Sequence, residues 1–117
     1  MGAQQFVEDW FAKWESEDFM SLPLTSDFRH TSPFGTINGK QEYLRLVEGN
    51  KNMFLGYNYT LHDSLYDPDK ACVRYTITKA DFSLDVCEWY YIKHGLIYEV
   101  IAYYHIGEVR QERKLRG

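Results

Sequence analysis

His30 and Glu88 are the two residues whose types and surroundings could support proton-transfer chemistry. An imidazole has an ordinary pKa of about 6.5, so it can accept and return protons near neutral pH. Glu88 lies on the even-numbered, otherwise apolar face of residues 82–92, where a carboxylate must be paired, hydrogen-bonded or protonated. Apolar surroundings raise the pKa of a carboxyl group toward the range of a general acid or base. We therefore predict His30 and Glu88 as a catalytic pair, if the fold brings them together across a pocket.

Both residues also have structural interpretations that the sequence leaves open. Glu88 can hydrogen-bond Tyr90, Tyr104 or Arg74 without performing any chemistry. His30 can bond a backbone carbonyl or a tyrosine hydroxyl at the edge of the core. The geometry of the folded chain has to distinguish these cases.

The segment HTSPFGTING, residues 30–39, joins His30 to the residues of a turn. Pro33 has no backbone N–H for strand pairing, and the glycines at positions 35 and 39 favour a change of chain direction. We interpret Ser32 as a turn residue rather than a nucleophile. Pro33 and the two glycines are therefore expected to shape the turn, and His30 is the candidate reactive group of the segment.

Hydrophobic periodicity predicts two helices and a short strand in the first half of the chain. Apolar side chains recur at helical spacing on one stripe of the first helix (Phe6, Val7, Trp10, Phe11 and Trp14). A short second segment covers 17–24, and period-two alternation predicts a strand over 27–32 with His30 facing the helices. Asn38, three residues before Gln41, resembles a capping box, so a helix is expected to start near Gly39.

The second half contains four strand-like runs separated by short turns (57–66, 71–78, 82–93 and 96–106). Short connections between long strands indicate hairpins, so the sheet is predicted to be an antiparallel meander. Helices followed by a meander predict an α+β fold, with one sheet and helices on one of its faces. The length of 117 residues fits a single domain spanning 1–117.

The last strand is apolar on both faces. Its even-numbered residues are predicted to face the core, which leaves Ile97, Ile101 and Tyr103 on the outer face of the sheet. An exposed apolar patch on a sheet is best explained by a partner. We therefore expect a homodimer that packs through the outer sheet face.

Composition narrows the function classes. Ten Tyr, seven Phe and three Trp make up 17% of the chain, which indicates a bulky core, an apolar cavity or a partner surface. The net charge of −4 argues against a nucleic-acid partner, which requires clustered Lys and Arg. The four histidines show no metal-ligand spacing, and no glycine-rich phosphate loop is present, so neither a metal nor a cofactor is expected.

Cys72 and Cys87 are the only cysteines, and neither belongs to a CxxC motif. Two reduced, half-buried thiols are typical of a cytoplasmic protein, although a disulfide between adjacent strands remains an alternative. The N-terminus does not have the pattern of a signal peptide, and no run approaches the roughly 20 apolar residues of a membrane helix. We expect a cytoplasmic protein without a membrane partner.

The order of these elements, with the segment DFRHTSPFGTINGKQEYL, resembles the nuclear transport factor 2-like superfamily over residues 4–107. Within it the chain is most similar to the SnoaL-like group, which contains polyketide cyclases and isomerases. The resemblance implies a cone-shaped α+β barrel, in which a curved antiparallel sheet wraps the N-terminal helices around an apolar pocket, and a dimer through the sheet. It also implies that rings from the first helix and the sheet line this pocket (Trp10, Trp14, Tyr75, Tyr90 and Tyr104).

The similar ketosteroid isomerases carry functional residues that can be compared one by one. Their catalytic aspartate precedes the proline of the turn, a position that Ser32 holds here, so Ser32 is grouped with the ligand-binding residues. Their oxyanion-donating tyrosine on the first helix corresponds to about Trp10, and their second acid corresponds to about Glu88. Steroid isomerase activity is therefore not expected.

The resulting hypothesis is a SnoaL-like protein that binds a small hydrophobic molecule in an aromatic-lined pocket. It would be a cofactor-free isomerase, cyclase or lyase that uses His30 and Glu88 for acid–base chemistry. The alternative is a non-catalytic module that binds a ligand in the same pocket or interacts with a partner as a dimer.

Overall fold

Six strands form one curved sheet in the order β2-β1-β6-β5-β4-β3. The computed structural model describes residues 2–105. The last four strands are the predicted antiparallel meander: β3 (Asn58–Tyr66), β4 (Lys70–Lys79), β5 (Phe82–Lys93) and β6 (Leu96–Tyr103). The predicted end of the last strand, at 106, lies outside the described residues.

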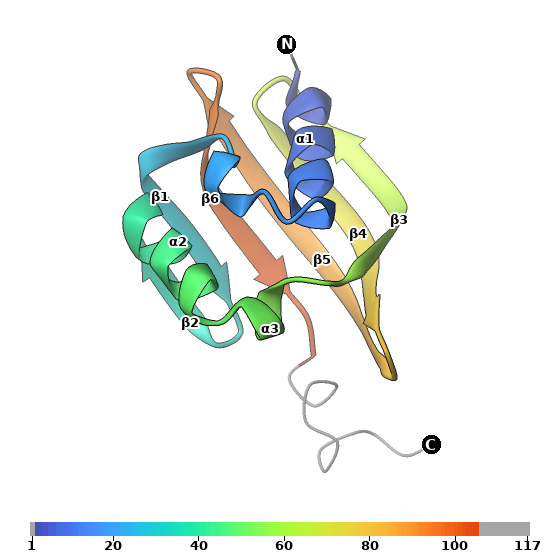
Figure 1. The fold of residues 1–117 in the computed structure, drawn as a ribbon. Helices are drawn as coiled ribbons and strands as arrows, with labels where there is room; N and C mark the ends of the chain where they lie inside the picture. The colour runs from blue at the N-terminus through green and yellow to red at the C-terminus, as the bar shows by residue number, and fades with distance from the viewer. Residues whose placement is uncertain (1, 106–117) are drawn as a thin grey trace.

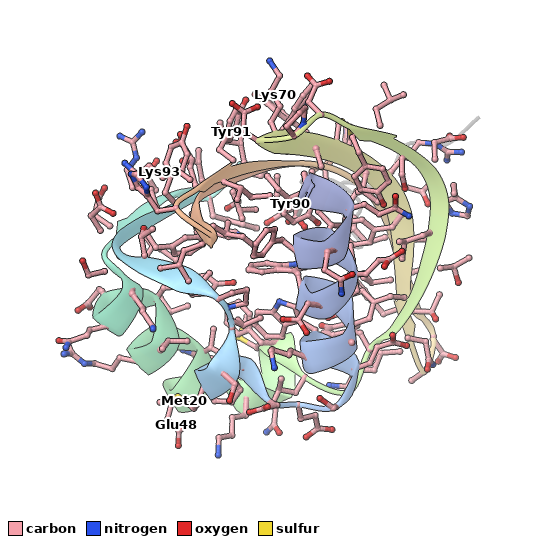
Figure 2. The ribbon with its side chains drawn as sticks, turned by 90° about the horizontal axis from the view of Figure 1, so that it is seen from above. Met20, Glu48, Lys70, Tyr90, Tyr91 and Lys93 are labelled. Atoms are coloured by element: carbon pink, nitrogen blue, oxygen red, sulfur yellow. The ribbon has the colours of Figure 1, made fainter. Side chains whose placement is uncertain are left out.

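The helices all lie on the concave face of this sheet (Figure 1). Helix α1 (Ala3–Glu15) packs over β3 and β4, whereas α2 (Lys40–Gly49) packs over β1 (Leu24–Ser32) and β2 (Gly35–Asn38). A short helix, α3 (Lys51–Phe54), follows α2 and leads into β3. Seen from above, the sheet curves around α1, which confirms the predicted cone-shaped α+β fold (Figure 2). No helix within residues 2–105 has the length and apolar character needed to cross a bilayer.

The predicted stripe of α1 forms the centre of the core. Val7, Trp10, Phe11 and Trp14 are buried, together with Ala3. The rings meet edge to face: the Trp10 centroid lies 5.7 Å from that of Tyr90, and Phe11 lies 4.9 Å from Tyr75. Edge-to-face contacts of this kind add to the stabilisation from buried area, so α1 is held against the sheet mainly by its aromatic residues.

The structure differs from the predicted first half at several points. The segment 17–24 contains a single turn of 3₁₀-helix (Phe19–Ser21), and β1 already begins at Leu24. The segment after Pro33 forms β2 rather than a plain turn, so Asn38 ends a strand and caps no helix. Helix α2 follows Gly39, whose φ of 95° favours glycine and whose N–H donates to Phe28 O at 2.7 Å.

Strand β1 pairs with β6 in parallel, so the sheet is mixed rather than wholly antiparallel. The register aligns His30 with Val100. On the other side of β6, Val100 pairs with Tyr90 in β5. This non-local pairing places the HTSPFGTING segment two strands away from β5, which carries Glu88, with β6 between them.

An irregularity between β5 and β6 reverses the expected faces at the start of β6. Ile92 pairs with Ile97, but the next residue back, Tyr91, pairs with Glu99, so Tyr98 is the extra residue of a β-bulge. As a result Ile97 is fully buried, whereas Leu96 is 37% exposed. The assignment of Ile97 to the outer face and of Leu96 and Tyr98 to the core was therefore wrong. Beyond the bulge the alternation is as predicted, with Val100 and Ala102 buried.

The outer, convex face carries the two cysteines. Cys72 Sγ and Cys87 Sγ lie 3.6 Å apart on the adjacent strands β4 and β5, and both thiols are free and half-buried. Tyr91, Lys70 and Lys93 project from the same side, away from α1 (Figure 2). Exposed apolar side chains on this part of the protein include Leu65 and Tyr103.

The bulge generates a stability prediction with an internal control. Replacement of the buried Ile97 by Ala should lower the free energy of unfolding by about 2–5 kcal/mol, because it leaves a cavity in the core. Leu96→Ala, one residue away, should cost less than about 1 kcal/mol, because Leu96 remains partly in solvent. Urea unfolding of both variants measures the difference. Equal losses, or a larger loss for Leu96→Ala, would contradict the bulge.

Candidate functional site

A cavity of about 450 Å³ lies between the helices and the concave face of the sheet. Residues from α1, α2, α3 and every strand from β3 to β6 line it, and more than half of the lining residues are Trp, Tyr or Phe. Its volume falls within the range of about 300–1,000 Å³ that is usual for small-molecule sites. The composition alone left open whether the many aromatic residues form a core, a cavity or a partner surface. In the structure they form both the core and the cavity wall.

Glu88 reaches this cavity from the inner face of β5. It is only 4% exposed, and it is flanked on the same face by Val86 and Tyr90. The Tyr75 hydroxyl donates to Glu88 Oε1 over 3.0 Å, and the Tyr90 hydroxyl donates a second, short hydrogen bond to the same oxygen. Within residues 2–105 no protein group is bonded to Oε2, which leaves this oxygen for a ligand or a proton.

Burial is the main influence on the ionisation of Glu88. Removal from water raises the pKa of the carboxyl group from 4.5 to about 7. The hydrogen bonds from Tyr90 and Tyr75 favour the carboxylate and act in the opposite direction, but they are the smaller effects. Glu88 is therefore divided between its two protonation states near neutral pH, as a general acid or base should be.

His30 lines the same cavity from β1, on the same concave face of the sheet. Its ring stacks on Tyr43 of α2, with centroids 5.1 Å apart and an interplanar angle of 26°. Burial lowers the pKa of the imidazole from 6.5 to about 4, so His30 is neutral at pH 7. The side chain stays partly exposed, because the ring borders the cavity.

His30 and Glu88 share the cavity without touching each other. They lie on β1 and β5, which are separated by β6 and hence by two strand spacings of about 4.8 Å each. No hydrogen bond joins them within the described residues, and burial alone causes the shift in the His30 pKa. The two groups can therefore act together only on a molecule that spans the space between them.

The other predicted site residues divide into two sets. Trp10, Trp14, Tyr75 and Tyr104 line the cavity. Tyr90 is fully buried and is not part of the lining; its ring packs on Trp10, and its hydroxyl bonds Glu88.

Ser32 also lies outside the lining. Its Oγ accepts the Phe34 N–H at 3.2 Å, as a turn residue does. Ser32 therefore acts in the turn, and the expectation that it contacts a ligand remains a prediction that the lining does not support.

Sequence reasoning missed several residues of the wall, above all Tyr43 and Tyr59. Their hydroxyls, like the indole N–H groups of Trp10 and Trp14, have no hydrogen-bond partner within residues 2–105. None of these atoms is fully buried, because Thr25 Oγ1 is the one fully buried, unpartnered side-chain polar atom in that range. They are therefore available to a ligand. Tyr43 lies with Leu44 and Val47 on the buried stripe of α2, and a helical stripe of this kind does not by itself indicate a pocket.

The structure offers no obvious metal centre in its described part. Within residues 2–105 no group of three or more His, Cys, Asp and Glu side chains is arranged to hold a metal ion. His62, the other histidine with a defined contact, bonds Thr76 Oγ1 at 2.7 Å, and Thr76 in turn donates to Asp85.

The two pKa shifts predict opposite pH effects on stability. Glu88 has a higher pKa folded than unfolded, so its stabilising contribution is complete below about pH 4.5 and is lost as pH rises through about 7. Glu88→Gln should therefore become more stable relative to the wild type across that window, by a total on the order of 3 kcal/mol. Urea unfolding at several pH values measures this, and a constant difference between the two proteins would contradict the buried, protonated carboxyl group.

His30 has a lower pKa folded than unfolded, so its contribution is complete above about pH 6.5 and is lost as pH falls through about 4. His30→Phe keeps a ring against Tyr43 and should gain stability relative to the wild type as pH falls through this window. The same unfolding series tests it. A gain toward high pH instead would show that the imidazole is charged in the folded protein.

Comparison with known proteins agrees with the geometry. The sequence model of the SnoaL-like domain matches residues 7–100. No curated protein matches the sequence significantly.

Solved structures share the fold at low sequence identity. An NTF2-like protein of unknown function from Cytophaga hutchinsonii superposes with a TM-score of 0.75 at 19% identity, covering 87% of this chain and 88% of that one. A SnoaL-like protein of unknown function from Burkholderia thailandensis gives 0.74 at 18% identity, with 88% and 93% covered. An LEH-like epoxide hydrolase from M. tuberculosis gives 0.73 at 18% identity, with 92% and 85% covered.

These similarities concern the fold, because all three identities are below a quarter. The sequence model covers most of the chain, including α1, the HTSPFGTING segment and the strand that carries Glu88. The chain belongs to the SnoaL-like domain family, with the nuclear transport factor 2-like fold.

Proposed function

We propose that this protein binds a small, largely apolar molecule in the aromatic cavity and moves a proton on it without a cofactor. Glu88 serves as the general acid or base, and His30 serves as a neutral hydrogen-bonding partner elsewhere on the cavity wall. The reaction class is that of an isomerase, cyclase or lyase. The observation that carries the proposal is a carboxyl group with a pKa of about 7 on the wall of a cavity lined mainly by aromatic side chains.

The geometry assigns different tasks to the two carboxylate oxygens. Oε1 is held by Tyr75 and Tyr90, which fixes the orientation of the group. Oε2 is the oxygen that exchanges a proton with the bound molecule, for example at a carbon next to a carbonyl group. A neutral imidazole at His30 can donate an N–H to a developing oxyanion or accept a hydroxyl proton.

The apolar wall supports binding of a ring-containing molecule. Trp10, Trp14 and Tyr59 offer flat surfaces, with few polar groups between them. Water is excluded from such a site once it is filled, which strengthens hydrogen bonds and proton transfer inside it. The epoxide hydrolase among the similar structures is consistent with chemistry on small molecules in this fold.

Proton transfer can be tested by hydrogen–deuterium exchange at the carbon α to the carbonyl of 2-tetralone, a bicyclic ketone of suitable size. The protein should accelerate exchange in D₂O, and Glu88→Gln should reduce that acceleration by about 100-fold or more. Glu99→Gln removes the same charge from a residue that is ion-paired with Arg29 at 3.0 Å, and it should behave as the wild type. Proton NMR follows the loss of signal. If exchange is no faster with the protein than in buffer, the protein does not transfer this proton. The alternative of a non-catalytic ligand-binding module would then remain.

A second candidate function, interaction as a homodimer, is favoured by the outer face of the sheet. Leu65 is 75% exposed and Tyr103 is 58% exposed on this face, beside the half-buried Trp89 and Ile101. We propose that a second copy covers this surface, which leaves the cavity on the concave side accessible. A ligand-binding dimer without catalysis is compatible with the same arrangement.

The dimer predicts a defined change in mass. Tyr103→Arg should convert a dimer into a monomer, because it places a charge in the centre of the proposed contact. Met20→Arg is the matched control, since Met20 is 61% exposed and lies away from the outer face (Figure 2). Size-exclusion chromatography with light scattering measures both masses. A monomeric wild-type protein, or dissociation by Met20→Arg alone, would exclude this interface.

A further inference from the structure

The cavity has an unusual balance of charge for a site expected to bind apolar molecules. Glu88 is the single acid among its described lining residues, and none of them is Lys or Arg. Lys79 lies next to the wall, but its Nζ already donates to Asn52 O and Leu55 O, each at 2.8 Å. Whenever Glu88 ionises, its negative charge therefore has no cation beside it within residues 2–105.

We propose that the cavity binds an apolar ring system that carries a positively charged amine, with the ammonium group at Glu88 Oε2. This inference rests on the proposed function for its ligand site: an amine held at Oε2 is a ligand of the cavity, not the molecule whose carbon exchanges a proton with that oxygen. It adds the chemical class of the ligand, which neither the fold nor the family determines.

The carboxyl group is already arranged for an ammonium partner. Oε1 accepts the two tyrosine hydroxyls, Oε2 has no partner in the described chain, and Glu88 is a lining residue of the cavity. Glu88 is more than nine-tenths buried, so its own removal from water has occurred on folding. A bound ammonium would form a charge-assisted hydrogen bond in a site from which water is excluded.

The aromatic wall also favours a cation over an anion. The face of an aromatic ring carries negative charge density and attracts cations within about 6 Å. The protein uses this contact with its own residues, since Lys79 Nζ lies 5.0 Å from the centre of Tyr57, which is part of the wall. An anionic ligand would instead meet Glu88 and the ring faces with no basic residue to balance it.

The other titratable groups around Glu88 are neutral near pH 7. Tyr75 and Tyr90 bond Glu88, and Tyr43, Tyr59 and Tyr104 face it from the other elements; burial raises the pKa of all five hydroxyls, so they stay neutral. His30, which lines the cavity from β1, is neutral above about pH 5. Between mildly acidic and mildly alkaline pH, Glu88 is therefore the lining group whose charge changes.

Three probes with the same ring and different charges test the inference: 2-(1-naphthyl)ethylamine, 2-(1-naphthyl)ethanol and 1-naphthylacetate. Calorimetric titration gives each affinity at about pH 8 and about pH 5.5; an alkylamine, like that of lysine, is protonated at both. At the higher pH the amine should bind about tenfold or more tightly than the alcohol, and the carboxylate should bind weakest. The advantage of the amine should shrink at the lower pH, where Glu88 is mostly protonated.

Two variants separate the charge of Glu88 from general effects. Glu88→Gln, which has nearly the same shape, should bind amine and alcohol with similar affinity, whereas Glu99→Gln on the outer face should keep the preference. The pH series on the wild-type protein tests the same point without any substitution.

Each outcome of this experiment is decisive. Equal binding of amine and alcohol at about pH 8 would overturn the inference and leave the proposed apolar site intact. An alcohol that binds better than the amine, and more tightly at low pH, would show that protonated Glu88 donates to a neutral ligand instead. If none of the three probes bound, the proposed function itself would fail.

Discussion

A carboxyl group held away from water by aromatic residues is the constraint on which the interior of this protein depends. Glu88 is stable there because Tyr75 and Tyr90 donate to one of its oxygens and because its pKa rises enough for a proton to neutralise it. These tyrosines are in turn held by Trp10 and Phe11 of α1. The packing of α1 on the curved sheet and the ionisation of Glu88 are therefore linked through the same rings.

The curvature of the sheet gives its two faces different roles. The concave face holds α1, α2 and the cavity between them, with Glu88 and His30 on its wall. The convex face carries the paired thiols, the Arg29–Glu99 ion pair and exposed apolar side chains. A ligand and a second copy of the chain would therefore occupy opposite sides of one sheet. A substitution on one face therefore does not touch the ligand or partner proposed for the other face.

Large rings form both the core and the wall of the cavity. Tyr and Trp combine a large apolar surface with one polar atom that usually finds a partner when buried. Several of their polar groups, including the Tyr43 and Tyr59 hydroxyls, are left without a partner in the described chain. Because these groups lie at the cavity rather than fully buried, they can hydrogen-bond a molecule that enters it.

The sequence by itself determined the elements that depend on local pattern. The stripe of α1, the meander from β3 to β6 and the burial of Glu88 follow from periodicities that neighbouring residues specify. Tertiary structure alone decided the parallel pairing of β1 with β6, the bulge at Tyr98 and the stacking of His30 on Tyr43. These depend on contacts between segments far apart in the chain, and no local periodicity records them. For the same reason the sequence could name His30 and Glu88, but only the folded chain could place them on one cavity without bringing them into contact.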